Sequence, residues 1–407
     1  FGSSPFAAPR QRTCNARKMG VCVGRDGGTD RHNCFSFIIF YHPAQKNRVL
    51  VTGASGLLGR QIMSLLHRQW EIRGLYSSRR REGMIHADLL KEGEIERQFA
   101  EFNPQVIIHS AAERRPDVVH KQPDKSRALN VDVTRGLAEA CRKHNAWLIN
   151  LSTDYIFDGE KPPYAVDAEA NPLSAYGEQK LEGERICSEV CPSSATLRVP
   201  LLYGPMEYVK ESGVTAMYLE LQKGVKKADH TQKRYPTYTI DVARILRKMI
   251  EVHFSGKKLN GIFHWQADEC LTKYDMLMHI AAIFQVDGSH IKQSLDPPKF
   301  PRPEDSRLDC SRLVEELGID PAQYRTEFAT ALRECFSTFP SEALALDIRD
   351  KMSPELQCQY SQDEVRNRLA EMNISICDVT VQRLMNKEGK INKDDYMAFL
   401  HHNIEGS

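Results

Sequence analysis

The sequence predicts an α/β fold: a doubly wound parallel sheet with a smaller C-terminal substrate-side lobe and an α-helical C-terminal extension. From residue 48, a short apolar strand pattern, a glycine-rich turn and an amphipathic helix pattern follow one another directly. Strand and helix patterns then alternate as far as residue 202, which indicates repeated βα units. The sequence contains no run of 18 apolar residues, so it predicts no membrane-spanning helix.

The composition argues against several classes of function. The 407 residues include 55 Lys and Arg against 54 Asp and Glu, a balance that is untypical of a dedicated nucleic-acid binder. The 11 cysteines include no C-x-x-C pair. Cys187 and Cys191 share one face of a predicted helix, but without a second ligand pair we expect no metal site. Buried free thiols in a reduced compartment are the better explanation, and we expect a cytoplasmic protein, with the nucleus as an alternative.

Residues 1–47 differ from the rest of the chain. They carry seven Lys and Arg against two Asp, with many Gly and Ser residues and little periodicity. This composition predicts a disordered basic leader. An Arg-rich, acid-poor transit peptide is the alternative, so organellar targeting stays open.

The first strand–turn–helix unit has the glycine spacing of a dinucleotide-binding loop. A strand pattern, residues 48–52, leads into Gly53, Gly56 and Gly59. Gly53 permits a tight turn, Gly56 lets the backbone approach a pyrophosphate, and Gly59 lets the helix pack closely on the strand. The helix then offers free N–H groups to the anion at its N-terminus. This context predicts a Rossmann-type dinucleotide site.

The end of the second predicted strand, residues 71–75, indicates which dinucleotide binds. An NAD site places an acidic residue near this strand end, whereas here the sequence continues with Arg79, Arg80 and Arg81. A guanidinium group suits a ribose 2′-phosphate. We therefore expect NADP(H) as the cofactor, with a solvated basic turn as the alternative.

The alternation of strands and helices continues beyond this point. The further predicted elements are strands 106–111, 146–153 and 195–199 and helices 124–144 and 172–190. Ser110 ends the third strand, where a cofactor would cross the sheet edge, and Asp88 and Leu89 could flank an adenine. Simple packing explains these three positions equally well.

A second motif follows the fourth predicted strand. Thr153 ends this strand, and Tyr176 and Lys180 lie one helical turn apart on the next helix, so they share one face. A Lys ammonium beside a phenol favours the phenolate and lowers the pKa of the phenol. With a strand-end hydroxyl to hold a carbonyl, the set predicts a proton donor for a carbonyl that accepts hydride.

These motifs carry a resemblance to known families. Residues from about 48 to 339 resemble the dTDP-4-dehydrorhamnose reductase branch of the extended short-chain dehydrogenase/reductase family, through STDYIFDG from Ser152, the Tyr176/Lys180 pair and RVPLLYG from Arg198. The similarity is narrowest to the regulatory β subunits of methionine adenosyltransferase. It is carried by the segments HSAAERRPDVV from His109, GIFHW, LTKYDM and RP-x4-LDCS.

The resemblance implies a regulatory NADP(H)-binding subunit that forms a hetero-oligomer with the catalytic subunit of S-adenosylmethionine synthetase. Such a subunit modulates S-adenosylmethionine biosynthesis in one-carbon metabolism, and no physiological oxidoreduction is established for it. Thr153, Tyr176 and Lys180 are the retained reductase positions, with Asp154 beside them. With the glycines and Lys180 of the motifs, the expected cofactor residues are Gly53, Ser55, Gly56, Leu57, Leu58, Gly59, Ser78, Arg79, Arg80, Asp88, Leu89, Ser110, Tyr176, Lys180 and Leu202.

We expect three regions. The basic leader covers residues 1–47, and the NADP-binding reductase-like domain covers 48–339. Its Rossmann core extends over about 48–202, and segments of about 203–339 build the smaller lobe. In that lobe, residues 234–243 predict a return strand that leads into a helix, and residues 271–284 predict a helix.

Residues 340–407 form the expected helical extension with an EF-hand-like motif. If Gly389 is the sixth loop position, Leu384 stands at the first, where Asp is needed. Asp395 stands at the twelfth in place of the bidentate Glu. Since calcium needs oxygen ligands at these positions, we expect a degenerate motif without useful calcium affinity.

The residues leave the choice between regulator and enzyme open. The alternative is an NADP-dependent oxidoreductase, similar to dTDP-4-dehydrorhamnose reductase, that reduces a nucleotide-sugar ketone through Thr153, Tyr176 and Lys180. A weaker third hypothesis makes residues 340–407 an interaction module added to either.

Overall fold

The computed structural model describes residues 46–297, 301–338, 360–361 and 390–391. The chain divides into residues 1–46 and 47–407, and the second unit contains every helix and strand of the described residues. The expected basic leader lies outside the described residues, apart from its last two positions. In the C-terminal extension the described residues form two short antiparallel strands, β12 (Tyr360–Ser361) and β13 (Lys390–Ile391). Most of the EF-hand-like loop also lies outside the described residues.

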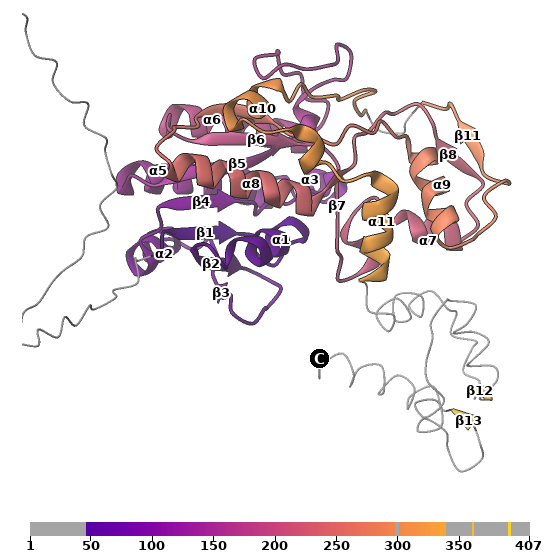
Figure 1. The fold of residues 1–407 in the computed structure, drawn as a ribbon, viewed down its shortest axis with the longest axis horizontal. Coiled ribbons are helices and arrows are strands. Elements are labelled where there is room, and N and C mark those ends of the chain that lie inside the picture. Colours follow the sequence, from indigo (N-terminus) through magenta and orange to yellow (C-terminus); the bar gives the residue numbers. More distant parts are fainter. Residues whose placement is uncertain (1–45, 298–300, 339–359, 362–389, 392–407) are drawn as a thin grey trace, which may run out of the picture. The chain divides into compact units, whose positions relative to one another are not determined.

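A parallel sheet of seven strands forms the centre of the second unit (Figure 1). The strand order is β10-β6-β5-β4-β1-β2-β3, and every neighbouring pair is parallel. The chain moves outward from β1 in both directions, which confirms the predicted doubly wound sheet and places its switch point between β1 and β4. The strands are β1 (Arg48–Thr52), β2 (Glu71–Tyr76), β3 (Ile85–His86), β4 (Val106–His109), β5 (Trp147–Thr153), β6 (Ala195–Val199) and β10 (Gly261–His264).

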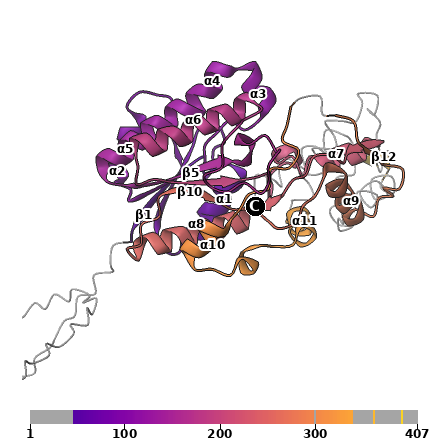
Figure 2. The ribbon, with the colours of Figure 1, turned by 90° about the horizontal axis from the view of Figure 1, so that it is seen from above.

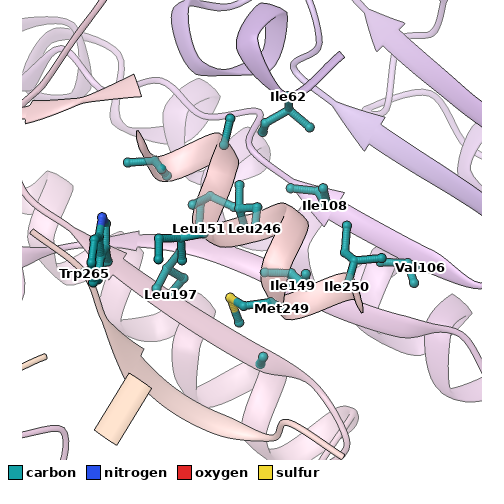
Figure 3. Packing of buried hydrophobic residues seen from close by; sticks show 14 of the residues in the cluster. Ile62, Val106, Ile108, Ile149, Leu151, Leu197, Leu246, Met249, Ile250 and Trp265 are labelled. Atoms are coloured by element: carbon teal, nitrogen blue, oxygen red, sulfur yellow. The ribbon is translucent and has the colours of Figure 1, made fainter. Parts of the chain in front are cut away.

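Helices cover both faces of this sheet (Figure 2). Alternate strand residues point to opposite faces, so Val49 and Val51 pack in one core cluster and Leu50 in another. The first cluster includes α1 (Leu57–Leu66), α8 (Thr239–Phe254) and α10 (Ser311–Leu317). The second includes α2 (Glu94–Phe102), α5 (Val133–His144) and α6 (Ala175–Val190). Figure 3 shows side chains of α8 packed over the strands.

Two elements of the sheet layer come from beyond residue 202. Helix α8 packs on α1 and on the sheet, and β10 pairs with β6 in parallel register. The smaller lobe is therefore built only from segments of residues 203–339, because α8 and β10 belong to the sheet layer. The reason is physical: β6 would otherwise be an open edge, and the apolar face of the sheet beside α1 would be uncovered.

A π-helical turn interrupts the predicted helix 124–144. The run consists of α4 (Pro123–Arg127), the π turn η1 (Ala128–Asp132) and α5, with α3 (Pro116–Lys121) before it. Asn130 lies buried in this turn, and its side-chain amide donates to the carbonyl of Glu113 and to Gln179 Oε1. Its Oδ1 accepts from the backbone N–H of Glu113 at 2.8 Å. The π turn thus aims a buried polar side chain at the segment after β4, and such turns are frequent at functional sites.

The smaller lobe has its own hydrophobic cluster. Return strand β9 pairs with β7 and leads into α8, as predicted. The predicted helix 271–284 is α9, which begins with a Thr272/Asp275 capping box. The elements are β7 (Leu202–Tyr203), α7 (Met217–Gln222), β8 (Lys227–Asp229), β9 (Thr237–Tyr238), α9 (Lys273–Ile283), β11 (Lys292–Ser294), α11 (Phe328–Ser337) and the 3₁₀ turn η3 (Val209–Glu211). A further 3₁₀ turn, η4 (Pro321–Tyr324), contacts α8 and packs with the sheet layer.

Two further expectations concern the state of the cysteines and the presence of membrane-spanning helices. The six cysteines among them are free thiols; Cys270 is exposed and the other five are buried. Helices long and apolar enough to cross a membrane are absent from the part of the chain that the structure describes.

Candidate cofactor and active site

The glycine turn between β1 and α1 is tightly packed. Gly53 has φ +65°, and a Cβ there would lie 2.8 Å from the backbone of Ala111 after β4. A Cβ on Gly59 would lie 2.2 Å from the Gly53 carbonyl oxygen. Gly59 therefore packs against the turn itself rather than against the strand, and both positions exclude a larger side chain.

The N-terminus of α1 presents its backbone to this turn. Gly56 caps the helix without a side-chain hydrogen bond, and the first turn carries no acidic residue. Ser55, Leu57 and Leu58 are buried. These residues thus offer an anion their N–H groups, as expected for a pyrophosphate subsite.

The carboxyl ends of β1 and β4 are joined by side-chain hydrogen bonds. Ser110 Oγ donates to the Thr52 carbonyl at 2.7 Å, and Thr52 Oγ1 is 2.8 Å from His109 Nδ1. Burial lowers the pKa of His109 to about 3, so the imidazole is neutral. This network holds Ser110 at the sheet edge beside the glycine turn.

Other predicted cofactor residues lie around the same edge. Asp88 is exposed and its Oδ1 accepts from the Leu90 N–H at 3.1 Å, while Leu89 packs against the core beside α2 and α5. Ser78 and Arg80 are exposed after β2, and Leu202 is partly buried on β7. Asp88 and Leu89 thus have local structural roles whether or not an adenine binds beside them.

The arginines after β2 meet two carboxylates from a distant segment. Arg79 Nη1 is 2.6 Å from Glu211 Oε1 and 3.5 Å from Glu207 Oε2. Arg60 donates from both Nη atoms to Glu211 at 2.7 Å each, and Arg81 contacts Glu207. The sequence alone shows no acid at this strand end because Glu207 lies 128 residues after Arg79. The fold brings two carboxylates to this strand end, and Arg79 and Arg81 therefore already form ion pairs with them.

The reductase set assembles where β5 ends. Thr153 Oγ1 donates to Asp154 Oδ1 at 3.1 Å, and Asp154 opens the 3₁₀ turn η2 (Asp154–Ile156). Tyr176 is close enough to Thr153 for the Thr153 side chain to affect the pKa of the phenol. Tyr176 and Lys180 lie one turn apart on α6, and the Lys180 side chain is buried. The structure therefore brings the three predicted residues to one strand end.

The electrostatics of this set differ from the prediction. Burial raises the pKa of Tyr176, the Asp154 carboxylate raises it further, and Arg114 and Thr153 oppose the shift. Burial lowers the pKa of Lys180, and Glu184 opposes that shift. The predicted lowering of the phenol pKa by Lys180 is thus wrong for this structure, because burial dominates the pKa of Tyr176 and Lys180 is not among the groups that shift it.

Sequence reasoning missed two residues that the smaller lobe brings to the same point. Ser306 Oγ donates to Asp154 Oδ2 at 2.5 Å. Burial raises the pKa of Asp154, and the Ser306 hydrogen bond and the Arg234 guanidinium oppose the rise. Arg114 is a further missed residue: it affects Tyr176 and also donates from Nη2 to the Glu211 carbonyl.

Metal chemistry has no visible basis in the described part of the chain. Its His, Cys, Asp and Glu residues form no group of three or more that could hold a metal ion.

The parallel sheet, the glycine turn and the strand-end Thr/Tyr/Lys set have the arrangement of a dinucleotide-binding fold of the reductase-like class. The family model described as "RmlD substrate binding domain" matches residues 47–337. A dTDP-4-dehydrorhamnose reductase from Bacillus anthracis, solved in complex with NADP, has the same fold. The TM-score is 0.61 at 23% identity, over 72% of this chain and 99% of that chain.

Curated relatives narrow the class. The methionine adenosyltransferase 2 subunit beta of Danio rerio is 42% identical over 298 residues, which is 72% of this chain and 91% of that protein. The Xenopus tropicalis subunit is 41% identical over 297 residues, 72% of this chain and 88% of that protein. The chain belongs to the family of methionine adenosyltransferase 2 beta subunits, within the RmlD substrate binding domain family.

Proposed function

We propose that this protein is a regulatory NADP(H)-binding subunit of S-adenosylmethionine synthetase, which associates with the catalytic subunit and modulates it. The observation that carries the proposal is the match to beta subunits over nearly their whole length, 91% of the Danio rerio protein. The proposal places the protein in the cytoplasm as part of a hetero-oligomer.

NADP(H) is the proposed cofactor. Backbone N–H groups at Ser55, Leu57 and Leu58 would bind its pyrophosphate, because they lie at the N-terminus of α1 beyond the turn that Gly53 and Gly59 permit. The Gly56 N–H donates to the Gly53 carbonyl at 2.9 Å, so Gly56 would contribute a close approach of the backbone instead. The relative from Bacillus anthracis that shares this fold was solved with NADP. The other proposed contacts are Ser78, Arg79 and Arg80 at the ribose phosphate, Asp88 and Leu89 at the adenine, and Ser110, Tyr176, Lys180 and Leu202 along the sheet edge.

The electrostatics favour binding over turnover at the nicotinamide side. The bound cofactor would supply a hydride, and this chain would supply Thr153 to hold a carbonyl and Tyr176 to donate a proton. A phenol whose pKa is raised by burial is a weaker proton donor than an ordinary tyrosine. The retained set is therefore better suited to holding the nicotinamide ribose than to driving reduction.

A binding and activity titration tests the proposal. The purified protein is added to the catalytic subunit, complex formation is measured by sedimentation, and S-adenosylmethionine synthesis is followed at each ratio. We expect a complex of fixed stoichiometry and a shift in KM or kcat that saturates with it. Absence of a complex, or unchanged kinetics within a complex, would refute the proposal.

A second function is favoured by the assembly of Thr153, Tyr176 and Lys180 at one strand end. The protein would then reduce a dTDP-4-keto sugar or a similar nucleotide-sugar ketone with NADPH. NADPH oxidation with candidate sugars should be lost in Tyr176→Phe. Equal oxidation by the variant and the wild type would exclude this mechanism, and the synthetase titration is independent of the outcome.

A further inference from the structure

Two glutamates of the smaller lobe occupy the arginine cluster after β2. Glu207 precedes the 3₁₀ turn η3 and Glu211 is the last residue of that turn, between β7 and α7. We propose that Glu207 sets the selectivity of the site between NADP(H) and NAD(H), because a ribose 2′-phosphate must displace its carboxylate from the arginines. This inference rests on the proposed cofactor site and concerns a residue outside the glycine-loop unit.

Glu211 is the fixed member of the pair. Its carboxylate is 1% exposed and accepts from Arg60, from Arg79 and from the Glu207 backbone N–H at 2.9 Å. Its own carbonyl accepts from Arg114. Breaking the ion pairs of a buried carboxylate with this many donors costs much free energy. Glu211 therefore anchors the segment and orients the guanidinium groups.

Glu207 is the member that can exchange. Its side chain is 29% exposed, and its oxygens lie 3.3 Å from Arg60 and 3.5 Å from Arg79, longer than the contacts of Glu211. It also contacts Arg81, whose pKa is lowered by burial and by the nearby Arg60. A partly exposed carboxylate gains only a small net stabilisation from its ion pairs, so a phosphate that offers more charge can replace it.

The two cofactors meet Glu207 differently. A 2′-phosphate carries negative charge, so it is repelled by the carboxylate and binds the arginines only after Glu207 has moved. A 2′-hydroxyl is neutral and can donate a hydrogen bond to a carboxylate, which is how an acid at this strand end favours NAD. Glu207 therefore lowers the affinity for NADP(H) and raises the affinity for NAD(H). The difference between the two affinities becomes smaller.

The test compares cofactor affinities of the full chain. Kd values for NADPH and NADH are measured by titration for the wild type, Glu207→Gln and the control Glu316→Gln. Glu316 also forms an ion pair, with Lys257 at 2.7 Å, next to β10 at the opposite edge of the sheet. We expect Glu207→Gln to increase the ratio Kd(NADH)/Kd(NADPH) by roughly tenfold, as for loss of one charge contact, and Glu316→Gln to leave it unchanged.

A second measurement uses only the wild type. Hydrogen exchange of residues 205–212 should rise when NADPH is added and should not rise with NADH. If the wild type binds NADPH but the ratio stays constant in Glu207→Gln, or if both cofactors affect the segment equally, Glu207 has no part in selectivity. If the wild type binds neither cofactor, the proposed cofactor site itself fails, and the inference fails with it.

Discussion

The Ser306 hydroxyl donates to Asp154 Oδ2 at 2.5 Å, across 152 residues of sequence. Both side chains are buried, with exposures of 0% and 1%. Ser306 lies in the chain between β11 and α10, and Asp154 follows β5 next to Thr153. One hydrogen bond thus joins the segment between β11 and α10 to the residue beside the proposed nicotinamide subsite.

We expect Ser306→Ala to lower the free energy of unfolding by roughly 1–3 kcal/mol, because a buried carboxyl oxygen loses its donor. Urea denaturation measures the change. Ser255→Ala is the control: this exposed hydroxyl donates to the Val252 carbonyl at the end of its own helix, and its loss should cost less than about 0.5 kcal/mol. Equal effects of the two substitutions would contradict the assigned role of Ser306.

Gly59→Ala and Gly183→Ala test the packing of the glycine turn. Both glycines lie in helices, but a Cβ on Gly59 would meet the Gly53 carbonyl oxygen at 2.2 Å, whereas one on Gly183 would meet Asn130 O at 3.5 Å. We expect Gly59→Ala to destabilise the fold by several kcal/mol or to prevent folding. Gly183→Ala should be neutral or stabilising by up to about 1 kcal/mol, since alanine favours helix. Thermal unfolding of the two variants compares them directly.

Arg79→Ala should weaken the binding of NADPH more than the binding of NADH. A charge-assisted hydrogen bond contributes about 1.5–3 kcal/mol, so loss of Arg79 should raise the Kd for NADPH about tenfold or more. NADH serves as the matched ligand, because it lacks the 2′-phosphate. An equal increase of the two Kd values would show that Arg79 supports the structure of the arginine cluster and does not bind the 2′-phosphate.

Stability should fall as the pH drops below about 6.5, the ordinary pKa of histidine. Burial lowers the pKa of His264 to about 3, with Arg198 adding to the shift, so between these two values the unfolded chain binds a proton that the folded chain does not. His264 therefore costs up to about 1.4 kcal/mol of stability per pH unit in this window and nothing above it.

The measurement compares wild type and His264→Gln by urea unfolding at pH 7.5 and 5.5. The wild type should lose about 1.4 kcal/mol more over this interval than the variant. The pKa of His109 is also lowered by burial, but His109 is present in both proteins, so its contribution to the pH dependence cancels in the difference. An identical pH dependence of the two proteins would show that His264 does not titrate in this way.

The sheet and the core of the site were predictable because their signals are local. The glycine spacing at Gly53, Gly56 and Gly59 lies within seven residues, and Tyr176 and Lys180 are one helical turn apart. The order of βα units follows from alternating patterns in the chain. These are short-range regularities that the backbone enforces by itself.

The remaining features depend on long-range contacts. Glu207 reaches Arg79 across 128 residues, and Ser306 reaches Asp154 across 152. The apolar pattern of α8 shows that the helix is buried on one side, but not which layer it joins. The pKa of Tyr176 could not be predicted from its spacing to Lys180, because burial is a property of the whole fold.

The position of α8 and β10 in the sequence, after residue 202, has a consequence for the folding of the chain during synthesis. When β6 leaves the ribosome, six strands exist, but their next neighbour is more than 60 residues away, at Gly261–His264. Until then the nascent chain carries an unpaired strand edge and an apolar face, both of which attract other chains. We expect the sheet to complete itself only after residue 264 has emerged, so a chain stopped at residue 202 should aggregate or be held by chaperones rather than fold as a smaller dinucleotide-binding protein.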